Sequence, residues 1–570
     1  MLGKYRECVI GAKMANLSQQ RREKMLEVIS QLRDERQDDV QIVRALNEIE
    51  KTLNEKKYGL VWEEHTEHVD EMLEANIPVL DEVKERKITV DESLDYNFLI
   101  EGDNLHALKL LEKTHRGKVD VIYIDPPYNT GNDFIYDDSY VDSSDSFTHS
   151  KWLSFMSKRL KKARQLLSSK GIIFISIDDR EHAALKCLCD EIFGSDNFIG
   201  NFVWVRKKKG SFLNKKIRKM TEYILCYSKQ NNSMEFFGES AYKDKWQPIV
   251  KRTNSIKTLK VESGCATTKL DNGYYKSGQY VEGNTGVKFL NDFYVEDGVV
   301  ITELNLKGRF VWTQEFLDDE LRNGTKIELS KKFGFNVLRY NQGEKTKAPS
   351  SLINSENGVG TNEDASKELE SLLEIPLEDS FSYSKPKSLI QYLINMTKII
   401  GNDLVVLDFF AGSGTTGHAV AALNKEDGGN RRYILCTNNE NGIAENVTYK
   451  RLTAIQDELS HNLKYFKTEY VPKFNEDTYV SSTLLEHIKP LIELEYACDL
   501  ESSRFDIILD EDEFDGFIED GKVKENGILF IASDILMSSD QEQILKDKNC
   551  RVEKIPEYYY KEELIESGEI

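Results

Sequence analysis

The feature that most constrains the fold is an alternation of short apolar segments with amphipathic ones, found in two separate parts of the chain. Before residue 235 it predicts strands at 98–101, 119–124 and 171–177, with helices at 104–112 and 151–167. After residue 381 it predicts a helix, strand, helix and strand at 389–400, 404–407, 416–423 and 433–437. Strands that alternate with helices form a parallel sheet covered on both faces. The sequence therefore predicts an α/β fold whose doubly wound, Rossmann-like core is assembled from residues 96–235 and 381–465.

The segment between these halves has a different character. Residues 236–380 hold Gly, Asn and Ser in irregular polar stretches with isolated aromatic side chains. Such a stretch predicts a module inserted into the α/β domain. At 570 residues the chain is too long for one hydrophobic core, so several domains are expected.

The two ends of the chain also differ from the core. Residues 1–95 are predicted as a helical region, with a helix over 15–55 that carries an apolar stripe. Such a stripe fits either internal core or a subunit contact, and we favour core. The stripe consists of Ile42, Leu46, Ile49 and Leu53. Residues 466–570, with an acidic run at 506–520 and a strand at 527–532, predict a small acidic α/β module.

Composition excludes several classes of protein. Hydrophobic residues make up 39% and charged residues 31%, as in a soluble globular protein. No apolar run is long enough to span a bilayer, and the first residues lack the apolar core of a secretory signal. Eight cysteines are scattered without the spacing of a zinc site or a disulfide framework. We therefore expect free thiols in a reducing cytoplasm, no bound metal and no membrane association.

The sharpest motif is Asp125-Pro126-Pro127-Tyr128, which directly follows the predicted strand at 119–124. The two prolines have fixed φ and make a rigid loop at the carboxyl edge of the sheet, where α/β proteins bind ligands. A carboxylate and a backbone carbonyl can accept the two N–H bonds of an exocyclic amine and expose its lone pair. Asp125 and the Pro126 carbonyl are suited to this, and Tyr128 offers a flat face for stacking an extruded base. The motif therefore points to methylation of a base amine.

The second motif is a buried strand that runs into a glycine-rich turn and a helix, at 405–416. This architecture lets the backbone approach a nucleotide-like ligand closely. No Lys follows the glycines, so the motif is not a phosphate-binding P-loop, and it lacks the third glycine of a dinucleotide fingerprint. Glu440 follows the next predicted strand, where a partner for ribose hydroxyls is expected.

The order of these motifs resembles the β class of amino-methyltransferases, with the DPPY loop first, then an inserted module, then the glycine loop. The sequence is most similar to the Mod subunits of type III restriction-modification systems. The segments that carry this resemblance are IEGDNLHALKLL (100–111), VIYIDPPYNTGNDFIYDD (121–138), HSKWLSFMSKRL (149–160), GIIFISIDD (171–179), EYILCYSK (222–229), KPKSLI (385–390), VLDFFAGSGTTGHAV (406–420) and YGLVWE (58–63).

The resemblance implies an S-adenosylmethionine-dependent methyltransferase that acts on the N6 amine of a flipped adenine in double-stranded DNA. It also implies a target-recognition role for the insert, a homodimer and a separate restriction (helicase–nuclease) subunit. The residues that match the catalytic motif are Asp125, Pro126, Pro127 and Tyr128. Those implied to bind the cofactor are Asp103, Asn104, Leu105, Asp125, Lys385, Pro386, Asp408, Phe409, Phe410, Ala411, Gly412, Ser413, Gly414, Thr415, Thr416 and Glu440. One departure is Thr221, where the family pattern has His before EYIL; it puts base positioning in doubt, but not the reaction type.

DNA binding has to be reconciled with a formal net charge of -22. Contact with phosphates needs only a local positive surface, and eight of the fourteen residues at 206–219 are basic. We expect these side chains to contact DNA: Arg206, Lys207, Lys208, Lys209, Lys215, Lys216, Arg218 and Lys219. A second basic cluster on the helix at 151–167 is a further candidate. Taken alone, a basic run is more often a solvated surface, and the position of these two runs beside a catalytic motif is what favours DNA.

One alternative is excluded at the level of sequence and others remain. Cytosine-C5 methylation needs a cysteine nucleophile, usually after proline, and the chain has no Pro-Cys pair, so this reaction is excluded. Cytosine-N4 methylation uses the same chemistry as adenine-N6, and only the Asp at position 125 favours adenine. A catalytically silent DNA-recognition module stays open, although both motifs are intact. Asp103 could cap a helix instead of binding cofactor, and we expect Trp152 and Trp204 to lie in the core rather than stack on DNA.

Overall fold

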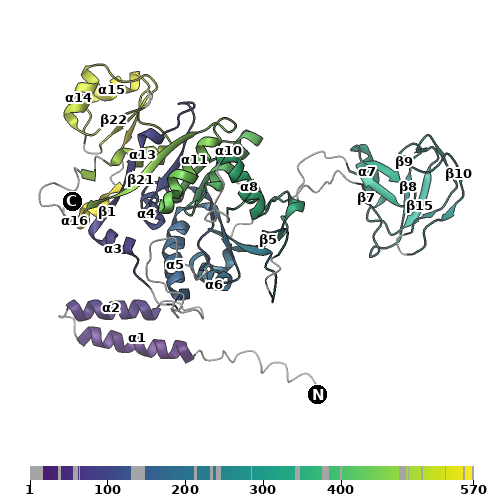
Figure 1. Cartoon of the computed structure of the whole chain (residues 1–570), viewed down its shortest axis with the longest axis horizontal. Coiled ribbons are helices and arrows are strands. Elements are labelled where there is room, and N and C mark those ends of the chain that lie inside the picture. Colours follow the sequence, from purple (N-terminus) through teal and green to yellow (C-terminus); the bar gives the residue numbers. More distant parts are fainter. Residues whose placement is uncertain are drawn as a thin grey trace.

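A ten-stranded mixed sheet forms the centre of the computed structural model of the chain (Figure 1). The structure describes residues 17–35, 40–54, 62, 65–129, 148–210, 215–230, 235–238, 246–283, 286–339, 347–374, 384–397, 401–473, 483–484, 487–501, 505–532, 535–555 and 559–567. In sheet order the strands are β1 (Asn76–Glu82), β21 (Asn462–Pro472), β2 (Tyr96–Glu101), β20 (Arg432–Thr437), β19 (Val405–Asp408), β3 (Val119–Ile124), β4 (Leu167–Ile177), β6 (Thr221–Ser228), β5 (Phe198–Val205) and β18 (Leu352–Ile353).

The sheet interleaves the two halves of the chain. Strands β21, β2, β20, β19, β3 and β4 run parallel, while β1 and β6 are antiparallel to their neighbours. β19 pairs with β3 in a register that places Val406 beside Val121. The parallel centre confirms the predicted α/β class. β18, which lies within 236–380, pairs with β5 and therefore belongs to this sheet rather than to the inserted module.

Helices cover both faces of the sheet, because alternate side chains of its buried strands face opposite layers. On β3, Ile122 and Ile124 belong to one apolar cluster, and Val121 and Tyr123 belong to the other. The first cluster includes side chains of α4 (Asn104–His115), α5 (Thr148–Leu166), α6 (His182–Phe193) and α13 (Ile488–Tyr496). The second includes side chains of α9 (Lys387–Asn395), α10 (Thr415–Asp427) and α11 (Lys450–Ala454), and Leu372 of α8 (Asn362–Leu373) packs against it. The doubly wound arrangement is thus confirmed.

Both tryptophans expected in the core lie there. Trp152 packs in the first cluster and Trp204 in the second, and neither is exposed to solvent. Neither can stack on DNA in this structure.

The inserted module has its own sheets and its own apolar core. A seven-stranded sheet and a four-stranded sheet, with one helix, enclose fully buried residues such as Val295, Leu306 and Ile327. Figure 1 draws this module apart from the central sheet. Its elements are β7 (Gln247–Pro248), β8 (Lys257–Val261), β9 (Ala266–Thr268), β10 (Gly273–Tyr275), β11 (Gly278–Gln279), β12 (Lys288–Phe289), β13 (Phe293–Glu296), β14 (Val299–Val300), β15 (Leu304–Gly308), α7 (Gln314–Arg322), β16 (Lys326–Leu329) and β17 (Phe335–Leu338).

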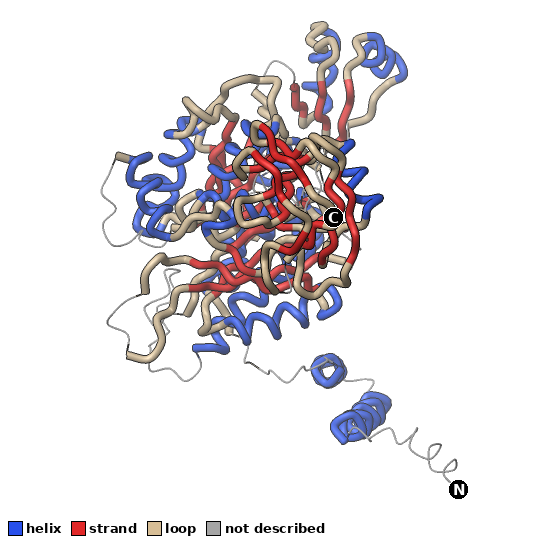
Figure 2. Tube along the Cα trace, turned by 90° about the vertical axis from the view of Figure 1, so that its right-hand side faces the viewer, coloured by secondary structure: helices blue, strands red, loops and turns tan. Residues whose placement is uncertain are grey.

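The region predicted as helical, residues 1–95, contains helices, but it also contains β1 (Asn76–Glu82), which joins the central sheet beside β21. The apolar stripe of the helical segment at 15–55 does not lie in a core. The segment forms two helices, α1 (Leu17–Glu35) and α2 (Val40–Asn54), which contact each other. Figures 1 and 2 both draw them apart from the central sheet. Leu46 is buried, whereas Ile42 and Ile49 are 36% and 49% exposed, and the Leu53 side chain lies outside the described residues. The expectation of core was wrong for Ile42 and Ile49, because α2 packs mainly against α1 and both side chains stay exposed there.

The C-terminal region divides between the core and a small module. α13 packs against α4 and β1, so it belongs to the core. The strands β22 (Phe505–Ile508), β23 (Ile528–Ile531) and β24 (Arg551–Lys554) form a parallel sheet with α14 (Glu511–Glu519) and α15 (Ser539–Asp547). The last described helix is α16 (Lys561–Ser567).

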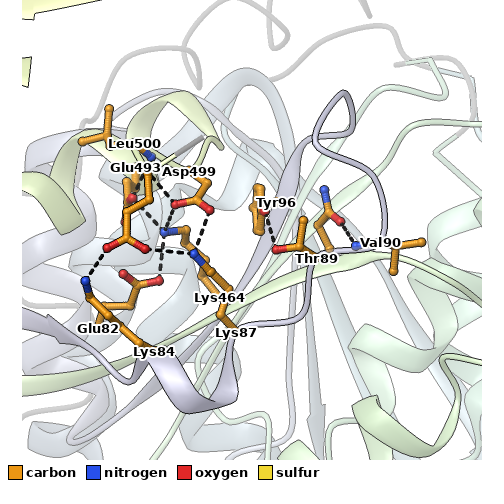
Figure 3. A network of polar contacts seen from close by, with 12 residues as sticks. Glu82, Lys84, Lys87, Thr89, Val90, Tyr96, Lys464, Glu493, Asp499 and Leu500 are labelled. Atoms are coloured by element: carbon orange, nitrogen blue, oxygen red, sulfur yellow. Dashed lines mark hydrogen bonds and ion pairs between the residues drawn. The ribbon is translucent and has the colours of Figure 1, made fainter. Parts of the chain in front are cut away.

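A buried charge cluster fastens α13 to the central sheet (Figure 3). Lys464 on β21 is fully buried, and its ammonium lies 2.7 Å from Glu493 and 2.9 Å from both Glu82 and Asp499. Lys87 also donates to Asp499, at 2.9 Å. Burial raises the pKa of Glu493 to about 7, although Lys464 opposes this rise. Lys464 on β21 thus pairs with Glu82 on β1, Glu493 on α13 and Asp499. Removal of any of these partners would leave buried charge less well paired where α13 meets the sheet.

Within the part of the chain that the structure describes, no helix has both the length and the apolar character needed to cross a bilayer. The seven cysteines in that part are free, and no group of three or more metal-ligating side chains comes together there.

Candidate active site

The two motifs lie side by side because their strands are neighbours. β3 ends directly before Asp125 and β19 ends at Asp408, and the two strands run parallel. Their carboxyl ends therefore meet at one edge of the sheet, where open α/β folds bind ligands. β2 and β20 end at the same edge and lead to Asp103 and Glu440.

An ion pair joins the catalytic loop to the second half of the chain. The Lys385 ammonium donates to both carboxylate oxygens of Asp125, at 2.8 and 2.7 Å, and to the Tyr128 hydroxyl at 3.0 Å. The Tyr128 hydroxyl donates in turn to Asp125, at 2.7 Å. Burial alone would lower the pKa of Lys385, but the nearby Asp125 and Glu222 carboxylates outweigh it and raise the pKa. Burial and the Asp125 charge raise the pKa of the Tyr128 phenol, so it stays protonated.

The two proline carbonyls of the loop differ in their partners. The Trp152 indole N–H donates to the Pro127 carbonyl at 2.7 Å, which ties the loop to α5. Within the described residues no hydrogen bond reaches the Pro126 carbonyl. That carbonyl is therefore the acceptor still available beside Asp125.

The glycine loop is shaped by its own hydrogen bonds. Asp408 accepts from the Phe410 amide at 3.0 Å and from the Thr416 hydroxyl at 2.5 Å, across the turn. Gly414, with φ of +73°, leads into α10, and an added Cβ there would lie 3.0 Å from the Thr448 methyl group. The left-handed backbone and this contact both require glycine. Burial raises the pKa of Asp408 to about 7, although the two hydrogen bonds oppose the rise.

The remaining residues of this loop also contact the other half of the site. The Ser384 and Ser413 hydroxyls lie 3.1 Å apart, and the Thr415 hydroxyl donates to the Lys385 carbonyl at 3.3 Å. Phe409 is fully buried, and Phe410 and Ala411 are nearly so. Pro386 is the N-cap of α9. The glycine loop and the segment around Lys385 thus form one continuous wall of the candidate site.

Asp103 caps a helix and also takes part in a buried network. Its Oδ1 accepts from the amides of Leu105 and His106, at 2.7 and 3.3 Å, so the capping interpretation is confirmed. Its Oδ2 lies 3.4 Å from the guanidinium of Arg159, a fully buried residue of α5. The carboxylate is 29% exposed, which leaves it able to meet a ligand as well.

Asn104 and Leu105 lie behind the site. Asn104 is fully buried and donates to the Phe409 carbonyl at 3.0 Å, while its own carbonyl accepts from Arg159. Leu105 packs against Val69 and Leu73 in a small apolar cluster. Asn104 therefore supports the glycine loop from behind. Glu440 lies just after β20, half-buried in a short 3-10 turn, η6 (Glu440–Gly442).

The basic residues at 206–219 do not share one environment, because three of them pair with carboxylates of other segments. The Arg206 guanidinium pairs with Glu222 at 2.9 Å, Lys208 pairs with Asp364 at 2.6 Å, and Lys219 pairs with Asp179 at 3.0 Å. Lys209, Lys215, Lys216 and Arg218 are exposed, and Lys207 is half-buried. Arg206 is half-buried and is linked to the catalytic loop through Glu222, which contacts Tyr128. On α5, Arg159 is fully buried, so the second basic cluster does not form a continuous solvated surface.

Sequence reasoning did not identify two buried carboxylates beside the site. Glu222 on β6 is 2% exposed and contacts Arg206, Lys385 and Tyr128. Glu181, before α6, accepts from Asn129, which directly follows the catalytic loop. The signal available for Glu222 was its place in the EYIL segment after Thr221.

Comparison with known protein families and relatives gives matches over much of the chain. A family model described as DNA methylase matches residues 119–448. The chain is 34% identical over 427 residues to the type III restriction-modification enzyme StyLTI Mod subunit of Salmonella typhimurium, covering 68% of this chain and 59% of that protein. It is 35% identical over 357 residues to the type II methyltransferase M.KpnI of Klebsiella pneumoniae, covering 61% of this chain and 82% of that protein. The chain thus spans about three fifths of the length of the StyLTI Mod subunit.

Solved structures are similar only at a low level. The M1.HpyAVI-SAM complex matches with 14% identity and a TM-score of 0.31, over 62% of this chain and 98% of that one. The PvuII DNA methyltransferase (cytosine-N4-specific) matches with 12% identity and a TM-score of 0.31, over 64% and 94%.

Proposed function

Because this chain belongs to the DNA methylase family, we propose that it transfers a methyl group from S-adenosylmethionine to the N6 amine of adenine in double-stranded DNA. The observation that carries the proposal is the pair of acceptors at the end of β3. The Asp125 carboxylate is held in place by Tyr128 and Lys385, and the neighbouring Pro126 carbonyl remains available. Two adjacent acceptors are what an exocyclic amine requires.

The chemistry follows from the state of the amine. An adenine N6 lone pair is delocalised into the ring, so the nitrogen is a poor nucleophile. Hydrogen bonds to Asp125 and to the Pro126 carbonyl draw the amine towards a tetrahedral geometry and expose the lone pair. A base that carries this amine must leave the duplex stack to reach the sheet edge. The Tyr128 ring is the flat surface on which we expect it to stack.

The residues around the glycine loop fit the cofactor. Asp103 offers a carboxylate, 29% exposed, for an amine, and Glu440 offers a carboxylate for ribose hydroxyls. Positive φ at Gly412 and Gly414 brings backbone close to the ligand side of the loop. When bound, S-adenosylmethionine supplies a methyl group activated by a sulfonium. We assign Asn104 to the support of this wall rather than to direct contact, because it donates to the Phe409 carbonyl. Leu105 packs against Val69 and Leu73 instead.

We assign sequence recognition to the inserted module. The catalytic loop meets a single base, so neighbouring base pairs must be read by other side chains in the grooves. The module at 247–338 has its own core and is inserted between the two halves of the site. The exposed Lys209, Lys215, Lys216 and Arg218, with Lys207, are proposed to contact phosphates.

The wider assembly is proposed by similarity. The named relatives include Mod subunits of type III restriction-modification enzymes. We propose that this chain is the modification and recognition subunit of such a system, forms a homodimer, acts in the cytoplasm and works with a separate restriction subunit.

The proposal is tested by analysing the product. Purified protein is incubated with double-stranded DNA and tritiated S-adenosylmethionine, and the nucleosides are separated by mass spectrometry. We expect N6-methyladenine from the wild type and none from Asp125→Ala, which should still bind the cofactor. If the product is N4-methylcytosine, the proposal that adenine is the target base is wrong. If no methylated nucleoside forms, the proposal that the chain is a DNA methyltransferase is wrong.

A further inference from the structure

The acceptor of the target amine is already occupied by another group of the same chain. Both oxygens of Asp125 accept from the Lys385 ammonium, at 2.8 and 2.7 Å. If the proposed function is right, on which this inference rests, an incoming amine must displace Lys385 from one of these oxygens. Lys385 is only 7% exposed, so bulk solvent does not compensate the charge of its ammonium in this structure. Loss of the carboxylate partner of a buried ammonium strongly destabilises the folded protein, because the charge stays buried without compensation.

A second carboxylate is in position to receive it. Glu222 Oε2 lies 3.4 Å from the Lys385 ammonium and 3.3 Å from the Tyr128 hydroxyl. The Glu222 side chain is 3% exposed, so its contacts are with protein groups rather than with bulk water. A short movement of the ammonium towards Glu222 would free an oxygen of Asp125 and keep the charge paired.

Arg206 fixes the direction in which Glu222 points. Its guanidinium lies 2.9 Å from Glu222 Oε1, which leaves Oε2 turned towards Lys385. The pairing follows from the antiparallel register of β5 and β6, in which Glu222 lies opposite Trp204, two residues before Arg206 and therefore on the same face as Arg206. Cations and anions alternate from Arg206 through Glu222 and Lys385 to Asp125. The group therefore carries no net charge, and removing Glu222 would leave two cations without a carboxylate between them.

We propose that Glu222 is a positioning residue that takes over the Lys385 ammonium when the target amine binds Asp125, and that Arg206 orients Glu222 instead of contacting DNA phosphates. This assigns a role in the reaction to two residues that touch neither the base nor the cofactor.

The test separates the rate of methyl transfer from DNA binding. Glu222→Gln and Arg206→Gln are compared with wild type in single-turnover transfer at saturating DNA and cofactor. Each variant should transfer about tenfold more slowly, because each removes a coupled ionic partner, and the double variant should be no slower than the worse single one. Arg116→Gln is the matched control, because Arg116 is an exposed arginine, 68% accessible, beside Glu112 on α4.

The salt dependence of DNA binding decides the role of Arg206. A phosphate contact contributes about one to the slope of log affinity against log salt. Arg218→Gln, in the same basic run, should lower that slope, whereas Arg206→Gln and Glu222→Gln should leave it unchanged. Wild-type transfer rates in Glu222→Gln, or a lowered slope in Arg206→Gln, would overturn the inference. If Glu222→Gln does not fold, the rate and slope of Arg206→Gln decide alone. Absence of product from the wild type would contradict the proposed function itself.

Discussion

Replacing Arg159 with Met should destabilise the core more than any surface substitution on α5. Arg159 is fully buried, and its guanidinium lies 2.8 Å from Glu67, 3.4 Å from Asp103 and 3.1 Å from the Phe155 carbonyl. Its Nε also donates to Asn104, which in turn supports the glycine loop. Methionine keeps much of the volume but removes the charge and all of these hydrogen bonds.

The size of the effect follows from what the substitution leaves behind. Removing one partner of a buried ion pair costs about 3–5 kcal/mol, because the other charge stays buried. Here the Lys158 ammonium remains 3.3 Å from Glu67, so that carboxylate keeps one cation. We therefore expect Arg159→Met to lower the free energy of unfolding by about 3 kcal/mol, near the lower end of that range. Burial already raises the pKa of Glu67, so adding Glu67→Gln, which removes the remaining charge, should recover part of the loss.

The assay is urea denaturation followed by tryptophan fluorescence, since Trp152 lies on the same helix. Lys161→Met, at an exposed position of α5, is the matched control and should change the free energy of unfolding by less than about 0.5 kcal/mol. A loss below about 1 kcal/mol for Arg159→Met, or no recovery in the double variant, would refute the argument that the buried charge is what Arg159 stabilises.

Three further predictions address charge and recognition. The raised pKa of Asp408, about 7, means that the folded protein holds a proton that the unfolded chain releases above about pH 4. The difference in unfolding free energy between wild type and Asp408→Asn should therefore change with pH, with wild type losing up to about 4 kcal/mol relative to the variant between pH 4 and pH 7. Urea titrations in which this difference is the same at both pH values would refute the prediction. Reversing the charges of Lys209, Lys215 and Arg218 should flatten the salt dependence of DNA binding, and an unaltered slope would mean that these side chains are only solvated. Exchanging the inserted module for that of a related enzyme should move the methylated sequence while N6-methyladenine remains the product; a folded, active chimera that still marks the original site would place recognition elsewhere.

The position of the site could be predicted because it follows from the order of strands. Loops after parallel strands share one edge of a sheet, so Asp125 and Asp408 were expected at the same edge once both strands were identified, and the pairing of β3 with β19 makes them neighbours there. The cap at Asp103 was likewise local, since an N-cap depends on residues two or three positions away.

The roles of the buried charges could not be predicted, because they depend on distant partners. Arg159 resembles its neighbours in the basic cluster on α5, and only the position of Glu67, ninety-two residues away in sequence, makes it an interior residue. Arg206 is one basic residue of a run, and its contact with Glu222 arises from the pairing of β5 with β6.

The failure at α2 has a similar cause. Periodicity shows that Ile42 and Ile49 share a helix face, but it does not show which surface, if any, covers that face. β18 was missed for a further reason, since a strand of two residues has no detectable pattern and is held by its register with Val203 and Trp204.

The strand order also affects how the protein forms during synthesis. β2 and β3 are made early, but in the sheet they are separated by β20 and β19, which end at residues 437 and 408. At about 5–20 residues per second, the ribosome needs on the order of tens of seconds to pass from the end of β3 to the end of β20. During most of that interval β2 lacks both of its neighbours, β20 and β21, and β3 has only β4 beside it, while the inserted module, with a core of its own, can already fold. The first half of the core must therefore wait with its sheet edges open, which makes this the period in which chaperones would matter most.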